Sequence, residues 1–131
     1  MYTVLIIDDD FSIRIATQAS IEIVAGWKTL LAASGAEGLT IAQAESPDVI
    51  LLDVMMPEMD GVTTLRHLRS HPATRSIPVI LFTSAIPESD PRVFSELSIL
   101  GIISKPFDAT ELVEQMQALL QEKKYSGGQF A

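Results

Sequence analysis

The chain has 131 residues, of which 47% are apolar and 20% charged, and its net charge at pH 7 is −8. This length and balance predict one globular domain with a core of its own. The negative charge argues against a nucleic-acid face and an anionic membrane surface, because both need clustered lysine and arginine. Since there is no cysteine, disulfides, thiolate zinc sites and cysteine nucleophiles are excluded. No apolar run approaches the roughly 20 residues of a membrane helix, so we expect a cytoplasmic protein.

Strand and helix signals alternate five times along the chain. The expected strands span residues 2–7, 27–32, 49–52, 77–82 and 101–104. The expected helices span residues 12–24, 34–44, 60–70, 88–100 and 108–120. Continuous apolar runs such as Val49–Leu52 are typical of strands buried on both faces. This alternation predicts a parallel α/β sheet covered by helices on both sides.

Punctuating residues define the ends of several of these elements. Ser34 with Glu37 and Asp108 with Glu111 form capping-box patterns, and Asp60 is placed to cap the third helix. Gly26 is a predicted helix stop. We expect a domain over residues 1–122 and a flexible C-terminal tail over 123–131, because the segment 126–128 is Ser-Gly-Gly.

Polar side chains gather at the predicted carboxyl ends of the strands. They are Asp8, Asp9, Asp10, Asp53, Thr83, Ser84 and Lys105. Right-handed crossovers bring those strand ends to one edge of a parallel sheet. The opposite strand ends carry Thr3, Lys28, Asp48 and Pro78, which form no comparable cluster. Ligands of open α/β folds bind at the carboxyl edge, so this asymmetry indicates a site.

The residue types at this edge suggest phosphoryl chemistry with a hard metal. Clustered carboxylates cannot all ionise cheaply, and Mg²⁺ or Mn²⁺ would relieve their repulsion. Asp53 alone is ambiguous between a metal ligand, a nucleophile and a chance strand end. Lys105 and Thr83 could hold phosphoryl oxygens. His67 and His71, four residues apart, could form a metal pair, but exposed helix positions explain them better.

Four motifs together resemble the receiver domain of two-component response regulators. They are IIDDDFSIR, LLDVMMPEMDG, ILFTSA and SKPF, in this order. The resemblance covers about Val4 to Leu120. It implies an α/β, doubly wound, flavodoxin-like fold, with a five-stranded parallel sheet in order 2-1-3-4-5 flanked by five helices.

The resemblance implies a divalent metal site. Asp8 and Asp9 would hold Mg²⁺ (or Mn²⁺), Asp9 directly and Asp8 through water. Asp53 would contribute a carboxylate oxygen and Met55 its backbone carbonyl. Asp10 follows this pair and is expected to be a loop or cap residue.

The resemblance also implies the phosphorylation machinery. Asp53 would accept the phosphoryl group, Thr83 would meet a phosphoryl oxygen with its hydroxyl, and Lys105 would pair with the phosphoryl group. A cis peptide is implied between Lys105 and Pro106. The donor would be a sensor histidine kinase or a histidine phosphotransfer protein.

The sequence departs from the common pattern of that family at several positions. Ile102 replaces the usual aromatic residue of the last strand, whose rotation reports phosphorylation. Pro87 and Pro91 make the start of the fourth helix unusual. Met55 and Ala85 place apolar side chains where the family tunes the lifetime of the phosphoryl group. Neither can orient an attacking water, so slow self-dephosphorylation is expected.

The favoured function is a phosphorylation-activated signalling switch, not an enzyme acting on other molecules. The expected output is altered binding of a downstream protein through the fourth helix and fifth strand, without direct nucleic-acid or membrane contact. A phosphorylation-dependent dimer is left open. The rival hypothesis is a magnesium-dependent phosphohydrolase of the haloacid dehalogenase type. That class needs an aspartate two residues after its nucleophile, where this chain has Met55.

Overall fold

The structure is a computed structural model that describes residues 2–83, 97–105 and 108–130. Its strands are β1 (Thr3–Ile7), β2 (Lys28–Ala32), β3 (Val49–Leu52), β4 (Val79–Thr83) and β5 (Gly101–Ser104). Its helices are α1 (Phe11–Ser20), η1 (Ile21–Ala25), α2 (Gly35–Glu45), α3 (Gly61–Ser70) and α5 (Ala109–Phe130). The predicted helix over 88–100 falls largely on residues 84–96, which lie outside the described part of the chain.

The strands form one parallel sheet in the order β2-β1-β3-β4-β5, which confirms the predicted topology. Strand β3 is central and all four of its residues are buried. Strands β1 and β3 run in register up to Ile7 and Leu52, so the next residue of each strand reaches the same edge. Strand β4 begins after Pro78, two residues later than expected, because proline has no N–H for the ladder.

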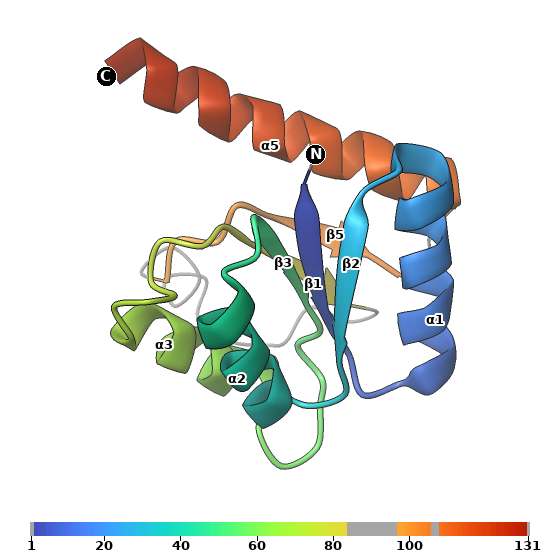
Figure 1. Cartoon of the computed structure of the whole chain (residues 1–131), viewed down its shortest axis with the longest axis vertical. Helices are drawn as coiled ribbons and strands as arrows, with labels where there is room; N and C mark the ends of the chain where they lie inside the picture. The colour runs from blue at the N-terminus through green and yellow to red at the C-terminus, as the bar shows by residue number, and fades with distance from the viewer. Residues whose placement is uncertain (1, 84–96, 106–107, 131) are drawn as a thin grey trace.

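Helices cover both faces of the sheet, as Figure 1 shows. On the face of α2 and α3, a core cluster joins the strand residues Ile7 and Leu52 to Leu65 of α3. On the face of α1 and α5, a second cluster includes Phe82 of β4 and Met116 of α5. Successive strand residues alternate between these clusters because strand side chains point to opposite faces in turn. Because helices pack on both faces of the sheet, the carboxyl ends of its strands are held together at one edge.

Side-chain caps begin four helices, and they fix where the loops at this edge end. The acceptors are Asp10 for the N–H of Ile13, Ser34 for Glu37, Asp60 for Thr63, and Asp108 for Thr110 and Glu111. Each cap satisfies N–H groups that have no partner within the helix. The caps predicted at Ser34, Asp60 and Asp108 are confirmed.

The first helix differs from the single helix predicted over 12–24. It begins at Phe11, and after Ser20 the chain widens into the π-helical turn η1. The wider turn keeps Ile21 fully buried while Ile23 is 82% exposed. The hydroxyl of Ser20 donates to the carbonyl of Ala16 at 2.8 Å, and such back-bonding often bends helices. Gly26, with φ 71°, ends the turn as predicted.

The last helix continues further than the sequence predicts. Helix α5 extends to Phe130, through Ser126, Gly127 and Gly128, where we expected a loose tail to begin. Each glycine costs a helix about 1 kcal/mol relative to alanine. Unlike proline, however, glycine keeps its N–H, so the helical hydrogen bonds can continue. The domain boundary at residue 122 stays a prediction.

Within the described ranges no helix, α5 included, combines the length and apolar character that a bilayer crossing requires.

Candidate functional site

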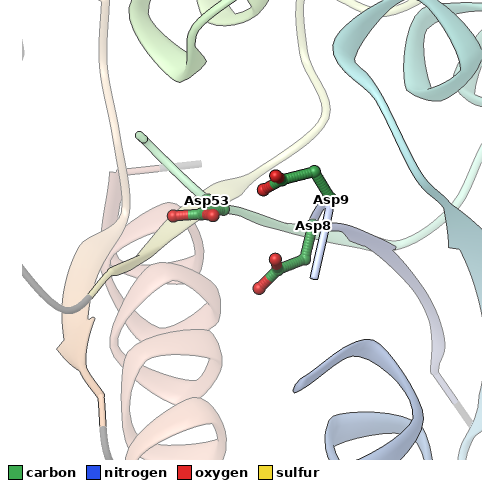
Figure 2. A group of neighbouring side chains, drawn as sticks. All are labelled: Asp8, Asp9 and Asp53. Carbon is green, nitrogen blue, oxygen red and sulfur yellow. The ribbon is translucent and has the colours of Figure 1, made fainter. Parts of the chain in front are cut away.

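Three carboxylates converge at the carboxyl edge of the sheet. Asp8 and Asp9 follow β1, and Asp53 follows β3. One oxygen from each lies within 4.8 Å of the others, and Figure 2 shows the side chains of Asp8 and Asp9 extending toward Asp53. Asp8 is fully buried and Asp53 is 6% exposed, whereas Asp9 is exposed. The predicted acidic cluster is therefore present, with its deepest members withdrawn from water.

Lys105 brings a positive charge into this cluster from the end of β5. Its Nζ lies 2.5 Å from Oδ2 of Asp8 and 3.6 Å from Oδ2 of Asp53. The lysine side chain is only 10% exposed. A buried ammonium is stable only when it is paired, and here two carboxylates share it. Lys105 thus partly neutralises a site that would otherwise hold uncompensated negative charge.

The surroundings of Asp53 raise its pKa from 3.8 to about 6. Burial is the largest cause, because it disfavours the charged form. The Lys105 ammonium and the backbone N–H of Met55 lower the pKa, while Asp8 and Asp9 raise it. At pH 7 a carboxyl group with such a pKa is about nine-tenths ionised. Asp53 is therefore largely ionised at neutral pH, although burial makes its charge costly.

The loop between β3 and α3 holds Asp53 from the other side. The N–H of Met55 donates to Oδ1 of Asp53 at 3.3 Å. A side chain at Gly61 would place its Cβ 2.5 Å from the Asp53 carbonyl oxygen, so only glycine fits there. Glu58 has φ 65°, and the N–H of Met59 donates to the Pro57 carbonyl at 2.7 Å across it. The loop is thus a tight turn with local strain beside the site.

A cleft of about 410 Å³ opens over these groups, and its lining includes all three carboxylates. The lining residues are Asp8, Asp9, Asp10, Ile13, Asp53, Met55 and Lys105. The Met55 side chain is 61% exposed at its rim. The Asp53 carboxylate can therefore be reached from solvent through this cleft.

Of the other predicted residues, Thr83 and Asp10 lie at the same edge. Thr83 ends β4 and is 2% exposed, and its carbonyl accepts from the N–H of Lys105 at 2.9 Å. Asp10 caps α1, the cap role expected for it. His71, four residues after His67, accepts the N–H of Ala73 on its Nδ1 at 3.1 Å, as a helix-end residue does. Pro106 and Ala85 lie outside the described residues, so the cis peptide and the tuning role of Ala85 stay predictions.

Two neighbours of the site were missed by reasoning from sequence. Arg14 donates through Nη1 to the backbone carbonyl of Asp8 at 2.8 Å and so supports the acidic loop. The ring of Phe82 lies beneath Lys105, with Nζ 5.0 Å from the ring centroid. Arg14 lies one helical turn after the cap residue Asp10, and this spacing could have predicted that its side chain lies near the acidic loop. Nothing in the sequence distinguishes Phe82 from an ordinary core residue.

Comparison with known proteins agrees with this geometry. The response regulator receiver domain family matches residues 4–117. This chain belongs to that family. The receiver domain is therefore a module of two-component signalling, and the predicted resemblance is confirmed over almost the whole chain.

Relatives of the receiver domain are regulators. The chain is 35% identical over 118 residues to a probable transcriptional regulator, ycf27, of Cyanophora paradoxa. It is 34% identical over 121 residues to the DNA-binding dual master transcriptional regulator RpaA of Synechocystis. These matches cover 90% and 92% of this chain but 48% and 50% of the relatives, so it spans about half their length. The solved chemotaxis protein CheY4 of Vibrio cholerae matches with a TM-score of 0.83 and 29% identity, over 91% of this chain and 98% of that one.

Proposed function

We propose that Asp53 accepts a phosphoryl group from a sensor histidine kinase or a histidine phosphotransfer protein. The observation that carries this proposal is the arrangement around Asp53. A largely ionised carboxylate faces an open cleft, with a buried ammonium 3.6 Å away and two further carboxylates within 4.8 Å. Attack by the Asp53 oxygen on phosphorus would break the bond to the donor imidazole and form an acyl phosphate. The cluster then has the groups needed to hold the product.

The residues present fit a hard divalent cation, Mg²⁺ or Mn²⁺. The set consists of oxygen donors, and the neighbouring Asp8 and Asp9 add to the burial that raises the pKa of Asp53, which supports a bound cation. Asp8, Asp9 and Asp53 would hold the cation together with the backbone carbonyl of Met55. When bound, such an ion neutralises charge on the carboxylates and on phosphoryl oxygens. The protein's own part is to fix the Asp53 carboxylate, through the N–H of Met55, where the cleft admits a donor.

Thr83 and Lys105 would respond once Asp53 is modified. The phosphoryl group adds negative charge and acceptor oxygens, which attract the Lys105 ammonium and the Thr83 hydroxyl. Thr83 ends β4 and Lys105 follows β5, so their movement would alter both strand ends. The predicted fourth helix follows Thr83 in the sequence, outside the described residues, and we propose that it responds as well. We propose that this edge forms the changed surface for a downstream protein, and that phosphorylation can promote a dimer.

The partner class follows from charge and from the relatives. The net charge of −8 argues against direct nucleic-acid binding by these 131 residues. The relatives are named transcriptional regulators, one of them DNA-binding, and extend to about twice the matched length. The argument from charge against direct nucleic-acid binding therefore applies to these 131 residues alone. A longer protein that contains such a domain could bind DNA through another part. A cytoplasmic location belongs to the same proposal.

The phosphohydrolase alternative gains nothing from the site. A hydrolase of that type needs an acid–base carboxylate at the position of Met55, whose side chain is apolar and 61% exposed. We propose instead a long-lived acyl phosphate, because Met55 offers no group to orient an attacking water.

The proposal is tested by incubation with acetyl phosphate and Mg²⁺, followed by intact mass spectrometry. We expect a gain of roughly 80 Da, one phosphoryl group. The gain should be lost in Asp53→Asn and with chelator. Asp10→Asn is the matched control, because Asp10 lines the same cleft but caps α1. A mass gain that survives Asp53→Asn, or none in the wild type with any phosphorylated donor, would contradict the proposal.

A further inference from the structure

The Lys105 ammonium has an aromatic neighbour in addition to its two carboxylates. Its Nζ lies over the ring of Phe82, 5.0 Å from the centroid. Phe82 is the residue before Thr83 in β4, and it is 1% exposed within the core cluster shared with α5. The ring therefore lies in the core behind the cleft, with the Lys105 ammonium over its face. The simplest explanation is that Phe82 only packs in the hydrophobic core.

The physics of this contact favours a second role. The face of a phenyl ring carries partial negative charge and attracts a cation within about 6 Å of its centroid. The attraction grows when water is excluded, and here the lysine side chain is 10% exposed. Of the three neighbours of Nζ in the described part of the chain, the two carboxylates titrate and can bind a metal, whereas the ring does neither. Its hold on the ammonium is thus independent of the state of Asp8 and Asp53.

We propose that Phe82 is a positioning residue for Lys105. The ring keeps the ammonium over its face, where Nζ lies 3.6 Å from Oδ2 of Asp53, whether or not Asp8 also binds Lys105. A leucine of similar bulk would fill the core but leave the ammonium held by carboxylates alone. The contact itself involves only Lys105 and Phe82. Its consequence for phosphoryl transfer rests on the proposed function of Asp53.

The direct test needs no phosphorylation. In metal-free protein, ¹³C-edited NMR should show the ε-CH₂ protons of Lys105 shifted upfield by the Phe82 ring, relative to those of exposed Lys28. The shift should persist in Phe82→Tyr, which keeps a ring face, and vanish in Phe82→Leu. If the wild type shows no such shift, or Phe82→Leu retains it, the inference is overturned whatever Asp53 does.

The kinetic test uses phenylalanine with one, two or three ring fluorines at position 82, which weakens the charge of the ring face at nearly constant size. We expect the rate of phosphorylation by acetyl phosphate to fall stepwise with each fluorine, and about fivefold in Phe82→Leu. The loss should appear in the maximal rate more than in the half-saturating donor concentration. In a Lys105→Met background the fluorines should have no effect, because no cation remains.

Ile103→Val is the packing control. Ile103 pairs with Phe82 in the sheet and is 1% exposed in the same core cluster, so its truncation perturbs packing without touching the ring. Its phosphorylation rate should equal that of the wild type. Equal rates across the fluorinated series, with a folded protein and a phosphorylatable wild type, would refute the positioning role. A wild type that takes no phosphoryl group refutes the proposed function instead, and the NMR shift still decides the contact.

Discussion

Replacing Asp53 by asparagine should stabilise the metal-free protein at neutral pH. The side chain keeps its shape but loses a charge that burial makes costly. The pKa of Asp53 is raised from 3.8 to about 6, so the folded state holds a proton more tightly than the unfolded chain does. Stability is therefore lost as pH rises from about 4 through about 6. One pKa unit corresponds to about 1.4 kcal/mol, so the loss is about 3 kcal/mol at pH 7.5 and under about 1 kcal/mol at pH 4.

The measurement is urea unfolding in EDTA at both pH values, followed by the fluorescence of Trp27, which is buried in the core. We expect Asp53→Asn to gain about 2 kcal/mol more at pH 7.5 than at pH 4. Glu114→Gln, which removes an exposed carboxylate from α5, should give no such difference. Added Mg²⁺ should raise the stability of the wild type at pH 7.5 more than that of Asp53→Asn. An equal gain at both pH values, or a loss at pH 7.5, would refute the reasoning.

Two further changes test the loop after β3. Glu58→Gly should stabilise the fold by about 0.5–1 kcal/mol, because glycine adopts φ 65° without strain. Gly61→Ala should destabilise the fold, because the added Cβ would lie 2.5 Å from the backbone carbonyl oxygen of Asp53. Thermal unfolding measures both, and shifts of the same sign would contradict this account of the loop. Met55→Asn should shorten the half-life of the phosphorylated protein by adding a group that can orient water. Loss of the roughly 80 Da mass increment over time measures it, and a half-life at least as long as the wild type's would count against the proposed tuning.

The sequence predicts the carboxyl edge well because parallel topology leaves it little freedom. Once β1 and β3 are parallel and in register, the residue after Ile7 and the residue after Leu52 must be neighbours. Asp8 and Asp53 could therefore be brought together without coordinates. The cap at Asp60 was equally predictable, because its hydrogen bond spans only three residues.

Side-chain contacts between residues far apart in the sequence could not be predicted. Lys105 lies closer to Asp8 than to Asp53, and only the relative placement of three strand ends decides between two acceptable partners. The contact of Phe82 with Lys105 could not be predicted either, because Phe82 also belongs to the hydrophobic core and looks like any other core residue in the sequence. The course of α5 through Gly127 was missed for a different reason, namely that propensity is a weak guide at helix ends.

Ile102 limits how a signal can leave Asp53. It lies on β5, 39% exposed, while its neighbour Ile103 is buried in the core cluster of the opposite face. A β-branched side chain has few rotamers and sweeps little volume, so it cannot signal as a rotating aromatic ring would. The backbone offers another connection, since the N–H of Lys105 donates to the carbonyl of Thr83 at 2.9 Å. Because this bond ties the end of β5 to the end of β4, a displacement of either residue is passed to both strands. We therefore expect these two strand ends to respond to phosphorylation together, with Ile102 carried along by its strand.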